Sequence, residues 1–222
     1  KMSKKIPYVN IPEQWKREKK LLMPIIEKVL SKGIYVGGDE VLKFEKKISE
    51  ICKVNYSVAL NSGTDAITMA LYLCGVRKGD EVITAPNTFI ATAAAIVHLG
   101  AKPVFVDVLI DYNMDPTKLK KAITSRTKAI MPVHLGGRVC NMTEICKIAK
   151  KYNLFVIEDA AQAIGSKFKN RPSGSFGKVG CFSAHPLKNL NACGDGGYIT
   201  TNDKKIYQQA VSLRNHGHVD RN

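Results

Sequence analysis

The chain has 222 residues, of which 45% are hydrophobic and 24% are charged, and its formal net charge is +15. This composition is sufficient for one substantial hydrophobic core, at the upper edge of the size of a single domain. No apolar run is long enough to cross a bilayer, and the first residues contain no apolar signal core. We therefore expect a cytoplasmic protein without a membrane partner.

The N-terminal residues are predicted to form an extended arm. Residues 1–14 contain Pro7 and Pro12, which disfavour regular structure in a short segment. The remaining residues, 15–222, are expected to form one large domain.

Periodic apolar residues predict the order of helices and strands in that domain. A helix is predicted over residues 15–31, with a kink at Pro24, and Asp39 is placed to cap the helix that follows. From Val54 onward, strand and helix patterns alternate, which indicates an α/β domain with a mainly parallel sheet. The predicted strands lie at 54–60, 82–85, 102–107, 127–133, 154–159, 180–183 and 197–201. Helices are predicted at 66–73, 142–152 and 204–213, together with an alanine-rich helix that ends at residue 98 and a helix that begins at residue 115.

The positive charge leaves two interpretations open. A strongly basic protein can bind nucleic acid, so a DNA-binding regulator is one alternative. However, the lysines are scattered through helical stretches such as Lys16-Arg17-Glu18-Lys19-Lys20 rather than forming an arginine-rich stripe with interleaved aromatic residues. We therefore expect no nucleic-acid partner; a basic site that attracts an anionic substrate is compatible with either interpretation.

Cysteine and histidine usage argues against metal and disulfide sites. The six cysteines form no C-x-x-C pair and resemble the reduced thiols of a cytosolic protein. The five histidines do not form an evident zinc-binding set, so no metal is expected.

Polar residues follow several of the predicted strands, at the edge where open α/β sheets bind ligands. Ser62-Gly63-Thr64 comes after a strand and opens a helix, so its backbone N–H groups and hydroxyls could cradle a phosphate or simply cap the helix. Asp159 ends another strand, where a carboxylate either caps the next helix or pairs with a cation of a ligand.

Lys188 is the candidate reactive amine. It lies after Ser183 in a segment with Pro186 upstream and several glycines downstream, which can shape a pocket around a lysine. Schiff-base chemistry requires an amine that is held in place with a lowered pKa. The alternative is a solvated lysine in a turn.

One cofactor would use all of these groups together. A phosphate needs a helix start and hydroxyls, a pyridine nitrogen needs a carboxylate to keep it protonated, and an aldehyde needs a lysine. Pyridoxal 5′-phosphate has all three requirements.

The chain resembles the DegT/DnrJ/EryC1/StrS group of pyridoxal-phosphate-dependent nucleotide-sugar aminotransferases from about Gly37 to its last residue. The resemblance implies the type I aminotransferase fold, with this chain forming the large domain and lacking the small C-terminal domain. It also implies a homodimer with active sites at the subunit interface. The matching segments include Asn61-Ser-Gly-Thr-Asp-Ala66, Thr88-Phe-Ile-Ala-Thr92, Val133-His-Leu-Gly-Gly137, Ile157-Glu-Asp-Ala-Ala-Gln162, Phe182-Ser183, Lys188-Asn-Leu190 and Gly194-Asp-Gly-Gly197.

The resemblance implies roles for single residues. Lys188 matches the lysine that forms the internal aldimine and then moves protons, and Asp159 matches the aspartate paired with the pyridinium nitrogen. The remaining matches are Gln162 near the phenolic oxygen of the ring, Phe89 stacked on the cofactor face, and Gly63, Thr64 and Ser183 at the phosphate.

The implied reaction moves an amino group from an amino acid, expected to be L-glutamate, to a nucleotide-linked keto-sugar in amino-sugar and cell-surface glycan biosynthesis. His185 and Leu187 depart from the commoner family residues. Lys188 argues against a dehydratase branch that has histidine at this position, and Gly194-Asp-Gly-Gly197 favours amination at sugar C3 over C4. Another type I pyridoxal enzyme acting on amino acids remains an alternative.

Overall fold

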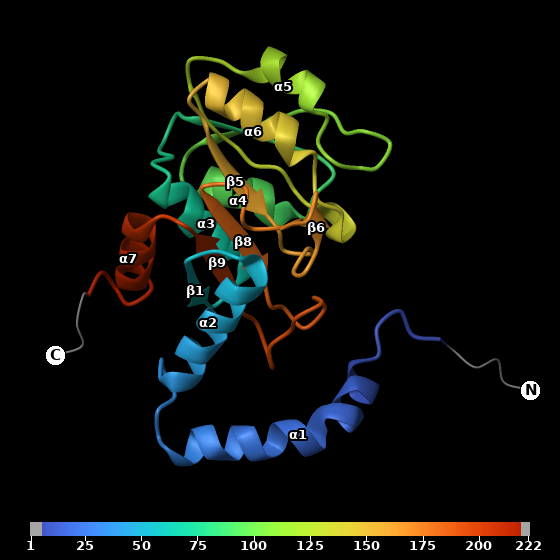
Figure 1. Cartoon of the computed structure of the whole chain (residues 1–222), viewed down its shortest axis with the longest axis vertical. Coiled ribbons are helices and arrows are strands. Elements are labelled where there is room, and N and C mark those ends of the chain that lie inside the picture. The colour runs from blue at the N-terminus through green and yellow to red at the C-terminus, as the bar shows by residue number, and fades with distance from the viewer. Residues whose placement is uncertain (1–5, 219–222) are drawn as a thin grey trace, which may run out of the picture. The chain divides into compact units, whose positions relative to one another are not determined.

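The computed structural model describes residues 6–218 (Figure 1). The chain divides into two compact units, Lys1–Lys43 and Phe44–Asn222. No helix within residues 6–218 combines the length and the apolar character that crossing a bilayer requires.

The first unit contains the long helix α1 (Ile11–Ser31). The Asn10 side chain caps this helix by accepting a hydrogen bond from the backbone N–H of Glu13 at 3.2 Å. Pro12 lies in the first turn, where its missing N–H leaves no helical hydrogen bond unmade. Pro24 lies inside the helix without ending it.

Two details of the predicted N-terminal part are wrong. The expected arm over 1–14 is helical from residue 11, because the cap and the proline begin the helix earlier than the apolar pattern indicates. Residues 1–5 lie outside the described part of the chain. Asp39 is not a cap: it is the first residue of α2 (Asp39–Cys52) and adds negative charge to its first turn.

The second unit is built on a seven-stranded sheet with the order β1-β9-β8-β5-β4-β2-β3. β9 pairs antiparallel with both neighbours, and every other pair is parallel, so all strands except β9 run in the same direction. The predicted mainly parallel α/β fold is confirmed. The strands are β1 (Tyr56–Leu60), β2 (Glu81–Thr84), β3 (Lys102–Phe105), β4 (Thr127–Ile130), β5 (Phe155–Asp159), β8 (Val179–Ser183) and β9 (Gly197–Thr201).

Helices cover both faces of the sheet, as Figure 1 shows. One buried cluster joins α3, α4 and α7 to alternate strand residues such as Val82 and Ile157. The neighbouring residues Ile83 and Val156 point to the other face, where α5 and α6 pack. The helices are α3 (Gly63–Leu73), α4 (Ile90–His98), α5 (Pro116–Ala122), the short 3₁₀ helix η1 (Leu135–Gly137), α6 (Met142–Lys151) and α7 (Lys204–Leu213).

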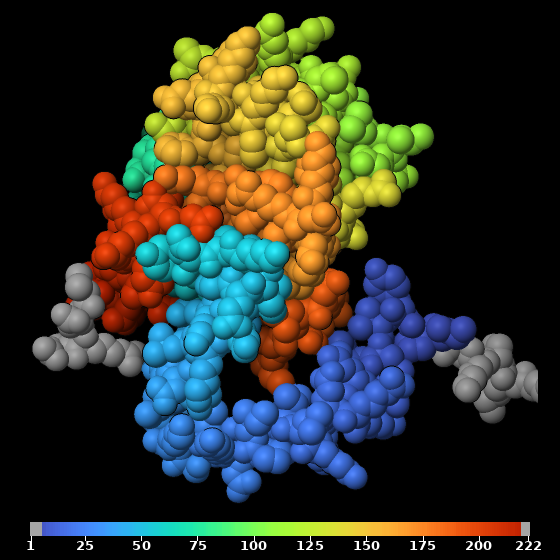
Figure 2. All heavy atoms as spheres, in the orientation of Figure 1, coloured from blue at the N-terminus to red at the C-terminus, as the bar shows by residue number. Residues whose placement is uncertain are grey.

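The second face is also covered by the end of α2 and by the segment between β5 and β8. Ile48 and Cys52 of α2 pack with Phe182 and Tyr198, whose rings stack at 4.9 Å between centroids. In Figure 2 the side chains of α6 and of the β5-to-β8 segment form a continuous surface on this face. That segment contains a two-stranded hairpin, β6 (Lys167–Phe168) and β7 (Arg171–Pro172), that the sequence pattern did not predict because two-residue strands have no measurable periodicity.

Gly197, the first residue of β9, permits a close contact between three chain segments. It is paired with Leu60 on one side and with Ser183 on the other. A Cβ atom at this position would lie 2.1 Å from the carbonyl oxygen of Ser62 and 2.6 Å from the backbone nitrogen of Gly63. Only glycine at position 197 therefore allows the start of α3 to lie directly against the start of β9.

Gly197→Ala should lower the free energy of unfolding by about 3 kcal/mol or more, because the new methyl group meets backbone atoms that cannot move alone. Urea unfolding followed by circular dichroism would measure this change. Gly196→Ala is the matched control: its Cβ would meet only the side-chain Cβ of Ala184 at 3.3 Å and that of Ala192 at 3.5 Å, so we expect a loss of about 1 kcal/mol or less. Equal losses in the two variants would contradict the assignment of the contact to Gly197.

Candidate active site

The candidate site lies at the carboxyl ends of β1, β8 and β5, with the first residue of β9 between the first two. Register places Ser183 beside Gly197 and Asp159 beside Cys181. Parallel strands of an open sheet expose backbone and side-chain groups at this edge, where ligands of such folds bind. The predicted candidates Gly63, Asp159, Ser183 and Lys188 all lie on segments that reach this edge.

The start of α3 forms one side of the site. Ser62 is the N-cap, and its Oγ accepts a hydrogen bond from the backbone N–H of Asp65 at 3.0 Å, which confirms the capping interpretation. Gly63 and Thr64 come next, before the first intrahelical N–H donor, so their N–H groups have no acceptor within the helix. A Cβ at Gly63 would lie 2.6 Å from the Cβ of Ser183, so this helix start packs directly on the end of β8.

The Asp159 carboxylate is almost completely buried, with 4% of the residue exposed. Its Oδ2 accepts a hydrogen bond from Thr92 Oγ1 at 2.7 Å, and its Oδ1 accepts one from the backbone N–H of Ala161 at 3.2 Å. Burial raises the pKa of this carboxyl above its ordinary value, while the two hydrogen bonds and the positive charge of Lys188 act in the opposite direction. The alternative role as a helix cap is wrong, because β5 is followed by a turn.

Lys188 lies in the connection between β8 and β9, close enough to Asp159 for its charge to act on the carboxylate. Backbone hydrogen bonds close the loop: Ala184 N–H donates to Gly196 O at 2.7 Å, and Ala192 N–H donates to Ala184 O at 2.8 Å. Within the loop, Lys188 N–H donates to His185 O at 2.8 Å. The residue is half-buried, which distinguishes it from a fully solvated lysine in a turn.

Gln162 and Phe89 lie on segments that flank Asp159 in the chain and in the fold, after β5 and just before α4. The Oε1 atom of Gln162 accepts a hydrogen bond from the backbone N–H of Gly136 at 2.7 Å, which leaves its Nε2 group as the donor for any further partner. Phe89 occupies the N-cap position of α4, one turn before Thr92, and is 70% exposed. Packing within the described residues therefore does not fix the Phe89 ring.

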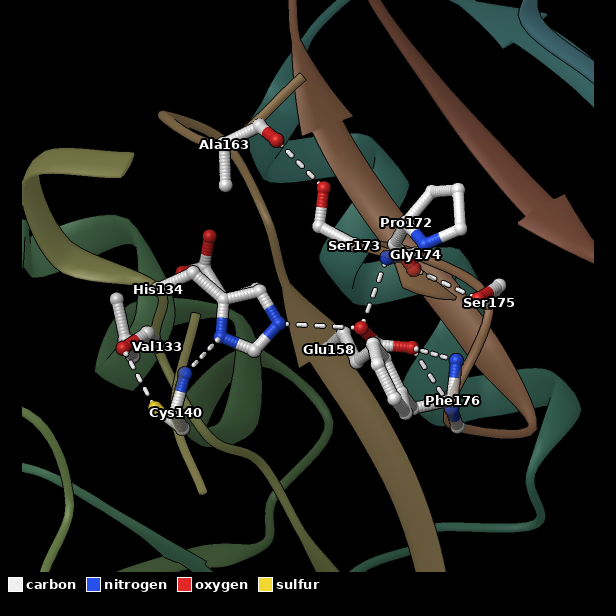
Figure 3. A network of polar contacts seen from close by, with 12 residues as sticks. Val133, His134, Cys140, Glu158, Ala163, Pro172, Ser173, Gly174, Ser175 and Phe176 are labelled. Carbon is white, nitrogen blue, oxygen red and sulfur yellow. Dashed lines mark hydrogen bonds and ion pairs between the residues drawn. The ribbon is translucent and has the colours of Figure 1, made fainter. Parts of the chain in front are cut away.

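Behind the site, the carboxylate of Glu158 is held by backbone donors (Figure 3). Glu158 is fully buried, and because side chains alternate along a strand it faces the side of β5 opposite to Asp159. Its Oε2 accepts from Gly174 N–H at 2.8 Å, and its Oε1 accepts from the N–H groups of Phe176 and Gly177, each at 2.7 Å. This one side chain therefore fixes the chain between β7 and β8.

His134 is the fourth partner of Glu158, with 3.0 Å between Nε2 and Oε2 (Figure 3). Nδ1 of His134 accepts a hydrogen bond from the backbone N–H of Cys140 at 3.3 Å. The ring proton is therefore on Nε2, which donates a hydrogen bond to the Glu158 carboxylate. The His134 backbone N–H also donates to Asp159 O at 2.9 Å. The pair therefore connects the end of β5 to the segment after β4.

Sequence reasoning assigned no role to Thr88, Thr92, His134 or Glu158, although all four belong to segments that carry the family resemblance. Two threonines four residues apart at a helix start are a visible signal, because such residues share one face of the helix. Within residues 6–218, no group of three or more His, Cys, Asp or Glu side chains could hold a metal ion.

Comparison with known proteins identifies the family. A family model matches residues 16–222. The chain belongs to the DegT/DnrJ/EryC1/StrS aminotransferase family, which this model describes. The resemblance found in the sequence is therefore confirmed.

Members of the DegT/DnrJ/EryC1/StrS family with similar sequences differ in their names. The chain is 45% identical over 213 residues to a dTDP-3-amino-3,6-dideoxy-alpha-D-galactopyranose transaminase of Aneurinibacillus thermoaerophilus, with 96% of the chain and 59% of the relative covered. It is 42% identical over 213 residues to a protein of Geobacillus stearothermophilus named pleiotropic regulatory protein, with 96% of the chain and 57% of the relative covered.

A solved structure in the same family matches the whole described fold. The X-ray structure of S. venezuelae DesV in complex with a ketimine intermediate superposes with a TM-score of 0.95 at 36% identity, covering 99% of the chain and 59% of DesV. The expected type I aminotransferase fold is thereby confirmed. The chain spans 57% to 59% of the length of these three proteins.

Glu158→Gln should lower the free energy of unfolding by about 3 kcal/mol, since an amide NH₂ would face backbone N–H donors and leave a buried donor unpaired. The measurement is urea unfolding of the purified protein. Glu144→Gln on the exposed side of α6 is the control and should change stability by about 0.5 kcal/mol or less, because its partner Lys147 is 4.0 Å away and solvated. A Glu158→Gln protein as stable as the control would show that the four hydrogen bonds do not hold the loop.

Proposed function

We propose that the protein binds pyridoxal 5′-phosphate at this sheet edge and transfers an amino group from an amino acid to a nucleotide-linked keto-sugar. When bound, this cofactor supplies an aldehyde that condenses with amines and a ring that accepts electrons from the substrate carbon. The observation that carries the proposal is that Lys188, whose charge acts on the buried Asp159 carboxylate, lies on a loop at the same sheet edge as the start of α3 and Ser183.

The donors and acceptors in the site fit the cofactor. The N–H groups of Gly63 and Thr64, together with the hydroxyls of Thr64 and Ser183, are donors and would bind the phosphate at the positive end of α3. Asp159 can accept more hydrogen bonds than the two from Thr92 and Ala161. It would therefore accept one from the protonated ring nitrogen of the cofactor.

Two further residues would orient the ring. Since Oε1 of Gln162 is occupied by Gly136, its Nε2 group would donate to the phenolic oxygen. The exposed ring of Phe89 would stack on one cofactor face, which would also exclude water from it.

Lys188 would act twice, first as the amine that holds the cofactor and then as a base. The Lys188 amine would be positioned by its loop, which a hydrogen bond between Ala184 and Gly196 closes. When its amine is free, Lys188 would take up the proton that leaves the substrate carbon and deliver it again within the site.

The names of relatives support the substrate class. The Aneurinibacillus relative is named as a transaminase of a dTDP-linked 3-amino sugar, which favours a nucleotide sugar and amination at C3 for this protein. L-glutamate is the proposed donor, and the proposed role is in amino-sugar and cell-surface glycan biosynthesis. The net charge of +15 would attract an anionic nucleotide diphosphate.

The alternatives have less support. A DNA-binding regulator is one alternative, and one relative is named pleiotropic regulatory protein. That name states no reaction and no DNA binding, and the chain matches the relative named as a transaminase over the same number of residues, 213. Another type I pyridoxal enzyme acting on amino acids would not account for the sugar-nucleotide name of a relative 45% identical.

We also propose a cytoplasmic homodimer. Free cysteines, six in number, are compatible with a reducing compartment. Near the site, the Asn87 side chain donates to Tyr112 O at 2.9 Å and joins two segments with large exposed apolar side chains, which a second subunit would cover. These exposed residues are Phe89, Ile90, Leu109, Ile110 and Tyr112.

Lys188→Ala should leave the protein folded but abolish turnover, because among the described residues Lys188 is the lysine whose charge acts on Asp159. In the unmodified protein, borohydride treatment should attach the cofactor irreversibly, and peptide mass mapping should locate it on Lys188. Lys167→Ala, which removes an exposed lysine of β6, is the control and should keep both properties. A normal rate in Lys188→Ala would refute the assignment.

Ile110→Asp should weaken the proposed homodimer by roughly tenfold or more, since burying an unpaired charge in an apolar interface is costly. Ile110 is 101% exposed in the single chain. Sedimentation equilibrium would measure the dissociation constant, with Leu213→Asp at the end of α7 as a control that should leave it unchanged. A monomeric parent protein would contradict the proposed dimer.

A further inference from the structure

Two threonine hydroxyls form a chain that ends on the Asp159 carboxylate. Thr88 Oγ1 lies 2.8 Å from Thr92 Oγ1, and Thr92 Oγ1 lies 2.7 Å from Asp159 Oδ2. Thr92 is in the first turn of α4 and is 1% exposed, while Thr88 is half-buried just before the helix. Water therefore cannot replace the Thr92 hydroxyl without a change in packing.

The direction of these hydrogen bonds follows from the number of protons. A hydroxyl has one proton to donate, and an ionised carboxylate can only accept. Because Thr92 donates to Asp159 Oδ2, its oxygen is the acceptor of the bond with Thr88. Thr88 therefore donates to Thr92, and each bond polarises the next toward the carboxylate.

This chain of donors opposes the effect of burial on Asp159. Burial favours the neutral acid and raises the pKa of the carboxyl, whereas the Thr92 hydroxyl, the Ala161 N–H and the charge of Lys188 favour the ionised form. A hydrogen bond to a buried charged group is stronger than one in water because the surrounding dielectric is low. Among the described residues, Thr92 supplies the one side-chain hydroxyl that donates a hydrogen bond to Oδ2 of Asp159.

We infer that Thr92, supported by Thr88, is a positioning residue that keeps Asp159 ionised and turned with a free lone pair toward the ring nitrogen of the cofactor. The inference rests on the proposed function, since it needs that cofactor in the site. Thr92 would act only through Asp159, on the affinity for the cofactor and on the protonation of its ring nitrogen.

Thr92→Val tests this inference, because valine has nearly the same shape and no hydroxyl. In the protein reconstituted with pyridoxal 5′-phosphate, we expect the dissociation constant of the cofactor to rise roughly ten- to hundredfold, as expected for the loss of a hydrogen bond to a charged group. With ring-labelled cofactor, the nitrogen-15 shift should move from the protonated range toward the unprotonated range.

Thr92→Ser is the matched control, since it keeps the hydroxyl and should restore both the affinity and the nitrogen-15 shift. Thr88→Val should have a smaller effect of the same sign, because it removes a donor one step further from Asp159. Thermal unfolding of the variants without cofactor separates these effects from a loss of folding: Thr92→Val and Thr92→Ser should unfold within a few degrees of each other.

The outcomes separate the two proposals. If the unmodified protein binds the cofactor and Thr92→Val binds it equally well with an unchanged nitrogen-15 shift, the inference about Thr92 is overturned while the proposed function stands. If the unmodified protein does not bind pyridoxal 5′-phosphate, the proposed function itself fails. If Thr92→Ser loses as much affinity as Thr92→Val, the side chain acts through packing and the inference is also overturned.

Discussion

The free energy needed to bury the Asp159 carboxylate is the constraint on which the rest of the site depends. A carboxylate so shielded from water stays ionised only if donors and cations face it from the protein. Here the donors come from the first turn of α4 and from the turn after β5, and the cation Lys188 comes from the loop between β8 and β9. The fold must therefore bring three separate segments to the end of one strand.

Two consecutive carboxylates on β5 show how the surroundings decide whether a buried carboxylate can accept a further hydrogen bond. Glu158 accepts four hydrogen bonds and has no capacity left, since a carboxylate offers about four lone-pair sites. Asp159 accepts two and can take another partner. Because side chains alternate across a strand, the saturated group anchors the loop before β8 on one face, and the unsaturated group lies on the face of α4.

The other half of the site depends on a reversal of strand direction. β9 runs antiparallel between β1 and β8, and its first residue, Gly197, has no side chain that would push the start of α3 away from this edge. The start of α3 can therefore lie against Ser183, which places the free N–H groups of a helix beside a hydroxyl. The chain belongs to an aminotransferase family, and several of the segments that carry the family resemblance lie at the ends of strands that meet at this edge.

The sequence by itself determined the local elements and the family. Periodicity predicted α7 over residues 204–213, the helix predicted from residue 115 is α5, and the segments around Asp159 and Lys188 indicated the cofactor chemistry. Only the tertiary structure decided the strand order, the bond between Thr92 and Asp159 across 67 positions, and the four donors of Glu158. The reason is that periodicity and capping act over a few residues, whereas hydrogen bonds between distant segments form only once the sheet has fixed which strand ends meet.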